Sequence, residues 1–197
     1  MKTGLYLLTG VVTFLCSCQT AVLEPEAYMR WVNDKSNGLI KEQTVGKVKY
    51  TVAYRPGNYQ LATSIIDNDS FAMKKNTGKN HCFIIRMEPA DGKTQVLTID
   101  AQEKQEPFER INYYLSEAQN DIRLVEGADT LKPASYIYER YYNLSPAQSM
   151  VVGFSQKGSL GDKDLQFAIE DRVFSTGKIY FHFDADKLKN IPSLKTK

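Results

Sequence analysis

Short segments in which apolar and polar residues alternate recur along the chain, and they constrain its fold more than any other feature. In the clearest segment, residues 45–54, Val48, Tyr50, Val52 and Tyr54 alternate with lysines and a threonine. A period of two is typical of an antiparallel strand with one buried face. Turn-forming residues separate the other segments of this kind, which are residues 81–87, 96–99, 122–125, 135–143, 148–154, 165–173 and 178–183.

Two segments show helical spacing instead. Pro25 followed by an acidic residue marks a helix start. Tyr28, Trp31 and Val32 share one face of this first helix, which is expected to pack on a sheet through Trp31. The second helix is expected over residues 107–118, where Phe108, Ile111, Leu115 and Ala118 share one face and Tyr114 widens it. Residues 59–66 fit a helix or a strand, and the pattern leaves both open.

A chain of 197 residues is long enough for one domain with its own core. The sequence predicts a β-dominated α+β domain over residues 25–197, either an antiparallel β-sandwich or a partly closed barrel with one or two packed helices. Within it, residues 81–87 and 96–99 are expected to pair as a hairpin. The lysine-rich residues 188–197 are expected to fray.

The N-terminal segment has the form of a signal peptide. Lys2 precedes an apolar stretch over residues 5–15, which is too short for a membrane-spanning helix. The stretch ends in Leu15-Cys16-Ser17-Cys18, which resembles the bacterial lipobox. The resemblance implies that residues 1–17 are removed, that Cys18 is lipidated, and that residues 18–24 tether the domain to a membrane.

Further motifs resemble a family of small envelope lipoproteins of Bacteroidota that has no assigned activity. They are the Tyr-x-x-Trp-Val pattern at residues 28–32, Asn-Gly-Leu at 37–39, Tyr-Arg-Pro at 54–56, and the segment 177–183. This resemblance implies a location in the cell envelope. No acidic run follows Cys18, which by the same resemblance favours the periplasm-facing side of the outer membrane. The tripeptide at residues 129–131 resembles an O-glycosylation motif of this phylum, with Thr130 as acceptor.

The charge balance argues against nucleic acid as a partner. Lys and Arg number 25 against 23 Asp and Glu, for a formal net charge of +2. A nucleic-acid-binding surface needs a clustered excess of basic residues.

No catalytic arrangement is apparent. His81 and Cys82 are neighbours on a predicted strand, so their side chains point to opposite faces and cannot act as base and nucleophile. Cys82 has no cysteine partner in the mature chain and is expected to be a small buried apolar side chain. His182 and Asp184 share a face, but no further histidine or cysteine completes a metal site. We therefore expect no enzyme, no metal and no cofactor.

The most unusual feature is the content of twelve tyrosines and nine phenylalanines. On the predicted strand 135–143, Tyr136, Tyr138, Arg140 and Tyr142 share one face. Such a face suits a glycan, a small ligand or a protein partner. Cross-strand packing explains the tyrosines equally well in physical terms and is the preferred interpretation.

These observations predict a lipid-anchored envelope lipoprotein that acts without catalysis, as a protein-interaction or assembly module. Its expected partners are the membrane, through the lipid, and other envelope proteins or cell-wall and glycan components. The alternative is a glycan- or small-ligand-binding β-domain that uses the tyrosine-rich face.

Overall fold

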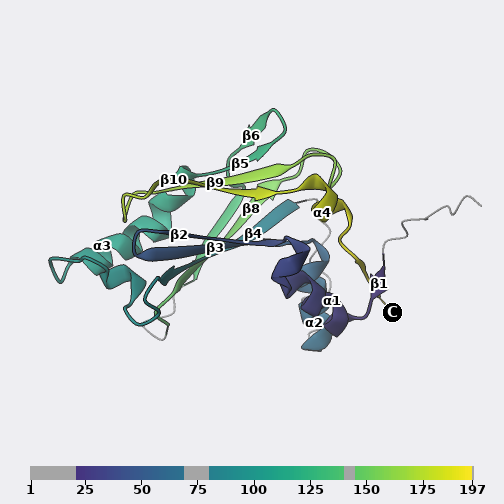
Figure 1. The fold of residues 1–197 in the computed structure, drawn as a ribbon, viewed down its shortest axis with the longest axis horizontal. Coiled ribbons are helices and arrows are strands. Elements are labelled where there is room, and N and C mark those ends of the chain that lie inside the picture. The colour runs from purple at the N-terminus through teal and green to yellow at the C-terminus, as the bar shows by residue number, and fades with distance from the viewer. Residues whose placement is uncertain (1–20, 69–79, 140–144, 197) are drawn as a thin grey trace, which may run out of the picture.

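The structure, a computed structural model, describes residues 21–68, 80–139 and 145–196. Two antiparallel sheets lie face to face, with helices at both ends of the stack (Figure 1). The five-stranded sheet has the order β2-β3-β4-β8-β7 and the four-stranded sheet the order β10-β9-β5-β6. The predicted β-dominated α+β sandwich is confirmed, and the sheets are not closed into a barrel.

The strands of the two sheets follow the alternation of the sequence. In the larger sheet they are β2 (Ile40–Val45), β3 (Val48–Arg55), β4 (Asn80–Pro89), β7 (Ser135–Glu139) and β8 (Gln148–Ser155). In the smaller sheet they are β5 (Ile122–Glu126), β6 (Asp129–Leu131), β9 (Leu165–Asp171) and β10 (Gly177–Phe183).

The helices lie outside the sandwich. Helices α1 (Pro25–Asn33) and α2 (Asn58–Ile66) lie together at one end, α3 (Glu106–Asn112) lies at the other end, and α4 (Ala185–Lys189) follows β10 (Figure 1). The segment that the sequence left open is therefore helical, because α2 covers it. The region of α3 continues as a π-helical turn, η4 (Tyr113–Glu117).

The core fills the space between the sheets. Val48, Tyr50, Val52 and Tyr54 of β3 are all buried, as their alternation predicts. At the centre, the Phe83 ring of β4 lies 4.9 Å from the ring of Phe167, 5.4 Å from that of Phe183 and 5.9 Å from that of Phe154. These rings join both sheets in one aromatic cluster.

The predicted hairpin of residues 81–87 and 96–99 is wrong. Strand β4 pairs with β3 and β8, and Val96–Thr98 forms a 3₁₀ turn. A turn sequence at residues 88–93 indicates only that the chain reverses, whereas the pairing of β4 is decided by distant strands.

The predicted fraying of residues 188–197 is also wrong for the part that the structure describes. Leu188 of α4 and Leu194 are buried. A two-residue strand, β11 (Ser193–Leu194), pairs in parallel with β1 (Val22–Leu23), so part of the segment expected to be a tether is a strand.

The two predicted helix faces are each confirmed in part. In α1 the buried residues are Tyr28 and Val32, while Trp31 is only partly buried. In the second helix Tyr114 and Ala118 are buried, as predicted, whereas Phe108 and Leu115 are exposed. The exposure of Leu115 coincides with the π-helical turn, whose wider turn departs from the phase of an α-helix, whereas Phe108 precedes this turn.

Among the described residues, no helix combines the length and apolar character needed to cross a membrane.

Candidate functional site

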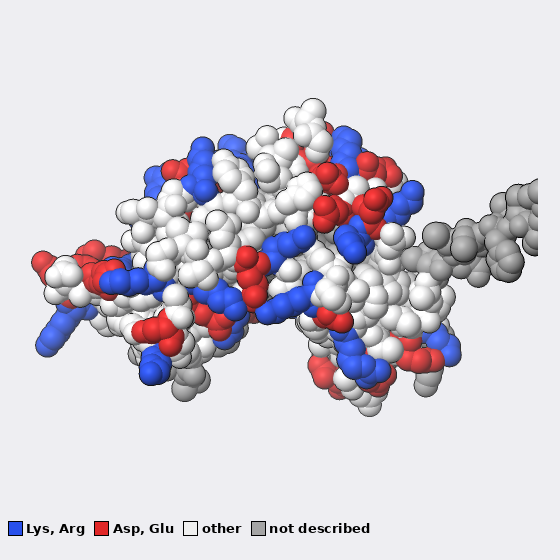
Figure 2. Space-filling view, viewed as in Figure 1, with Lys and Arg blue, Asp and Glu red and all other residues white. Residues whose placement is uncertain are grey.

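The candidate site is a groove between helix α2 and the outer face of the five-stranded sheet, called here the sheet–helix groove. Its volume is about 590 Å³, within the range of about 300–1,000 Å³ that is usual for ligand sites. In Figure 2 the outline of the molecule is indented between the sandwich and helices α1 and α2. The groove is lined from the helix by Tyr59 and Thr63 and from the sheet by Cys82, Ile84, Val151 and Ile137.

The floor of the groove is a row of apolar side chains that crosses the sheet. The strand registers place Ala53, Ile84, Val151 and Ile137 side by side on β3, β4, β8 and β7. Because these positions alternate with the core positions, their side chains point away from the other sheet. Within this row Ile137 is exposed, at 61%, whereas Ile84 and Val151 are half-buried and Ala53 is buried.

The neighbouring row on the same face has the polar character that is usual for the outside of a sandwich. It consists of Thr51, Arg86, Ser149 and Glu139. One row of this outer face is polar and the next is apolar. An isoleucine exposed to solvent does not stabilise the fold, so the apolar row indicates a binding surface.

The end of the groove beside the helices is polar. Arg55 donates from Nη1 to Asn33 Oδ1 at 2.9 Å, and its guanidinium carbon lies 4.4 Å from the centre of the Tyr59 ring. The Arg55 Nε is buried without a hydrogen-bond partner among the described residues. Asp67, the C-cap of α2, also lines the groove. The groove therefore combines an apolar floor with charged side chains of both signs in its lining.

Cys82 lies in the groove and is half-buried, not fully buried as predicted. Burial raises the pKa of the Cys82 thiol, and the guanidinium of Arg55 opposes this rise. A raised pKa keeps the thiol protonated and a poor nucleophile. His81, on the opposite face of β4, is buried in the core. The expected separation of His81 from Cys82 is therefore confirmed.

A buried pair of polar side chains joins the two sheets. His81 Nε2 lies 3.4 Å from Glu126 Oε1, and neither ring nitrogen has a hydrogen-bond partner among the described residues. Burial lowers the pKa of His81, while Glu126 raises it to a smaller extent. Both side chains are buried, since His81 is 1% and Glu126 4% exposed.

A second buried carboxylate is fully hydrogen-bonded. Asp171 accepts from the Tyr50 hydroxyl at 2.7 Å, from the Tyr114 hydroxyl at 3.1 Å, and from the backbone amides of Val173 and Phe174 at 2.9 and 3.3 Å. Burial raises the pKa of Asp171, and these hydrogen bonds counteract the rise. Because all of these contacts lie within the fold, the role of Asp171 is structural.

The described half of the predicted tyrosine-rich face is turned inward. Tyr138 is buried, stacks on Tyr114 at 5.8 Å between ring centres and donates its hydroxyl hydrogen bond to Gln148. The Tyr136 hydroxyl donates to the Tyr114 carbonyl at 2.5 Å. This arrangement agrees with the packing interpretation. Arg140 and Tyr142 lie outside the described residues.

The remaining predicted positions are dispersed. Cys18 lies outside the described residues. Thr130 is exposed on β6, at an edge of the four-stranded sheet. His182 is exposed on β10, 3.4 Å from Asp184 and 3.6 Å from Asp164, and the described residues contain no cluster suited to a metal ion.

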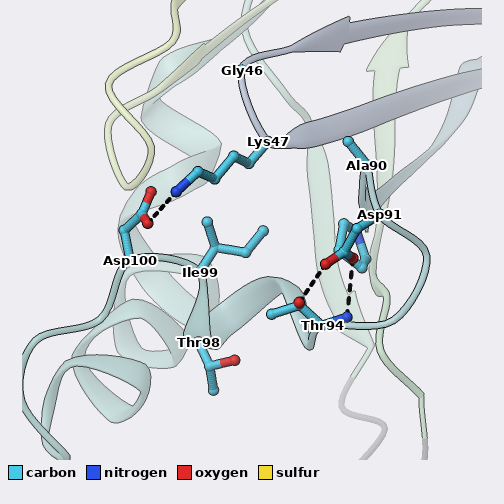
Figure 3. Close-up of a pocket in the computed structure, with 9 residues that line it drawn as sticks. Gly46, Lys47, Ala90, Asp91, Thr94, Thr98, Ile99 and Asp100 are labelled. Atoms are coloured by element: carbon cyan, nitrogen blue, oxygen red, sulfur yellow. Dashed lines mark hydrogen bonds and ion pairs between the residues drawn. The ribbon is translucent and has the colours of Figure 1, made fainter.

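A pocket of about 460 Å³ lies at the end of the sandwich that carries α3 (Figure 3). Its charged groups already have partners. The Lys47 ammonium points to Asp100 at 2.5 Å, and Asp91 accepts from the Thr94 amide and hydroxyl at 3.0 and 2.5 Å. Because these groups pair with one another, the pocket is a weaker candidate than the sheet–helix groove.

Sequence reasoning did not find the groove. Its residues come from four strands and one helix, and the pairing of those strands is long-range. One signal was present: Ile137 stands opposite the tyrosines in the alternation of residues 135–143. Once the tyrosines face the core, Ile137 must face solvent or a partner.

Comparisons of the chain with protein-family models, with characterised proteins and with solved structures find no match.

Proposed function

We propose that this protein is a lipid-anchored component of the bacterial cell envelope that works by binding, without catalysis, through the sheet–helix groove. The observation that carries the proposal is the apolar row on the outside of the five-stranded sheet. Exposed apolar rows that adjoin a helix are typical of surfaces that bind partners.

The proposed partner is an extended apolar segment of another envelope protein. The floor of the groove offers Ile84, Val151 and Ile137 in a line across neighbouring strands. Burial of such side chains contributes about 25 cal/mol for each Å² removed from water. The lipid adds to this affinity, because it confines the protein and its membrane partners to one surface.

The proposed anchor would lie close to the first described strand. Cys18 stands only four positions before Val22, the first residue of β1. A fully extended chain spans at most about 3.6 Å per residue, so a lipid on Cys18 would hold β1 within about 15 Å of the bilayer. We place the protein on the periplasm-facing side of the outer membrane.

A non-catalytic role has support from the side chains that the structure describes. The Cys82 thiol has a raised pKa and no histidine on its face of the sheet. The buried His81 and Asp171 are closed off from solvent.

The test is purification of the full-length lipidated protein from its own membranes, with and without the substitution Ile137→Lys. A charge at this position would be buried by any partner in the groove, so the partner should be lost by more than about tenfold. The control is Phe108→Lys, which places the same charge at a side chain that is equally exposed, at 61%, on α3.

Recovery of one stoichiometric partner with the wild type and with Phe108→Lys, but not with Ile137→Lys, supports the proposal. A partner that remains with Ile137→Lys, or no partner with any of the three, contradicts it. Circular dichroism of each purified variant shows whether the fold is retained.

A further inference from the structure

A shallow trough crosses the outer face of the four-stranded sheet, on the opposite side of the sandwich from the sheet–helix groove. Its volume is about 360 Å³, and its lining comes from β5, β6, β9 and β10. Tyr180 stands at one side and is 51% exposed. Among the described residues, Tyr180 and Phe108 are the aromatic side chains that are both large and exposed.

The register of the strands explains why the trough is open beside Tyr180. Tyr180 of β10 is paired with Ala168 of β9, which in turn is paired with Arg123 of β5. The small Ala168 between two long side chains leaves a flat floor, with the phenol ring on one side and the guanidinium on the other. No ring of the described residues stacks on Tyr180, so its face is available.

The polar groups of the trough are also available. Arg123 donates from Nη1 to the carbonyl of Ile122 at 2.6 Å, which leaves most of its donors for a ligand. Lys178 and Glu170 are direct cross-strand neighbours, yet neither forms an ion pair with a described residue. Arg172, at the end of the trough, is neutralised by Asp121 at 2.6 Å.

We propose that this trough binds a saccharide, with one sugar ring lying flat against Tyr180. A pyranose ring has an apolar face of C–H groups that packs on an aromatic ring, and its edge carries neighbouring hydroxyls. Planar guanidinium and carboxylate groups, such as those of Arg123 and Glu170, donate to and accept from such hydroxyls in pairs.

The mixture of charges selects the chemistry of the ligand. A strongly anionic ligand such as a phosphate would meet the Glu170 carboxylate, and a cationic one would meet Arg123 and Lys178. The hydroxyls of an uncharged sugar can hydrogen-bond to the donors and to the acceptors of the trough, and no charge needs to be neutralised.

This site goes beyond the proposed partner groove and is independent of it, because the two lie on different sheets and share no residue. It also differs from the predicted tyrosine-rich face, of which Tyr136 and Tyr138 pack inward.

The test uses the full-length protein in a detergent without sugar groups, on an array of uncharged oligosaccharides of glucose, galactose, mannose, xylose and N-acetylglucosamine. We expect saturable binding of at least one of them. Tyr180→Ala should weaken binding by about tenfold or more, since the loss of a ring contact is worth about 1.4 kcal/mol. Tyr180→Phe keeps the ring and should bind within about threefold of the wild type.

Arg123→Ala should weaken the same binding, whereas the matched control Phe108→Ala should leave it unchanged. Ile137→Lys should also leave it unchanged, which separates a failure of this proposal from a failure of the groove. Absence of binding at about 1 mM oligosaccharide, the limit of weak specific affinity, would overturn the proposal. Equal binding by the wild type and Tyr180→Ala would overturn it as well.

Discussion

The two buried carboxylates, Asp171 and Glu126, differ in how completely the fold satisfies them. Asp171 accepts hydrogen bonds from two tyrosine hydroxyls and two backbone amides and so connects the end of β9 with β3 and η4. Glu126 has one oxygen without a partner among the described residues, and its other oxygen lies 3.4 Å from His81. A satisfied buried group stabilises the fold, whereas a partly satisfied one costs free energy.

The stability of the protein should therefore depend on pH through His81. Burial lowers the pKa of His81 below its ordinary value near 6.5, although Glu126 opposes this shift. The unfolded chain then binds the proton more tightly than the folded chain. The free energy of unfolding should have its full value above about pH 6.5 and should decrease as the pH falls below this value.

Urea unfolding of the wild type and of His81→Gln between pH 8 and pH 5 measures this dependence. The variant cannot titrate at this position, so its stability should decrease less over the same range. The groups nearest the imidazole are Glu126 of β5 and Tyr54 of β3, whose ring lies 6.1 Å away, and neither changes in the variant. Parallel curves for the two proteins would show that His81 is not the titrating group.

The elements were predictable from sequence to the extent that each depends on its own residues. The alternation in β3 and the Pro25 start of α1 predicted a strand and a helix that the structure contains. The partner of β4 was not predictable, because the turn after it gives no information about β3 and β8. The buried face of the second helix was predicted only in part, because the π-helical turn η4 changes the period where Leu115 stands.

The terminal pairing of β1 with β11 was missed for a related reason. Two-residue strands show no alternation, and a lysine-rich sequence is typical of exposed chain. Their pairing rests on the backbone bonds from Ser193 N to Ala21 O, at 2.9 Å, and from Lys195 N to Leu23 O, at 2.8 Å. The buried Leu194 side chain joins them to the core.

Leu194→Ala should consequently destabilise the whole domain. Removal of a buried leucine side chain typically costs about 2–5 kcal/mol, and a terminal position that relaxes easily belongs at the lower end of this range. Lys195→Ala is the control, because the ion pair of Lys195 with Glu24 is exposed and contributes little to stability. Thermal unfolding of both variants tests this prediction. Equal midpoint temperatures would mean that β11 does not contribute to the stability of the domain.

On the scale of the whole molecule, both described ends of the chain lie at the end of the sandwich that carries α1 and α2, and α3 lies at the other (Figure 1). With the proposed anchor at Cys18, the end with α1 and α2 would face the bilayer, and the pocket at Lys47 would point away from it. The sheet–helix groove and the saccharide trough would then open sideways on opposite faces.

The anchor itself is tested by Cys18→Ser, with Cys16→Ser as the matched control. We expect incorporation of labelled palmitate and sedimentation with membranes to be lost in Cys18→Ser and retained in Cys16→Ser, because two or more acyl chains on one residue are needed for stable attachment. Label that persists in Cys18→Ser would place the lipid on another residue. Loss of the label in Cys16→Ser would also contradict the assignment of the lipid to Cys18.

The pairing of β1 with β11 also determines when the domain can be completed. Export delivers a polypeptide from its amino end, so with the proposed export Val22 and Leu23 would reach their compartment long before their partners Ser193 and Leu194. Until the last strand arrives, β1 has no neighbour, and the lipid would already hold the incomplete domain against the bilayer. Maturation of the protein would thus finish at the membrane surface, as the final step of its secretion.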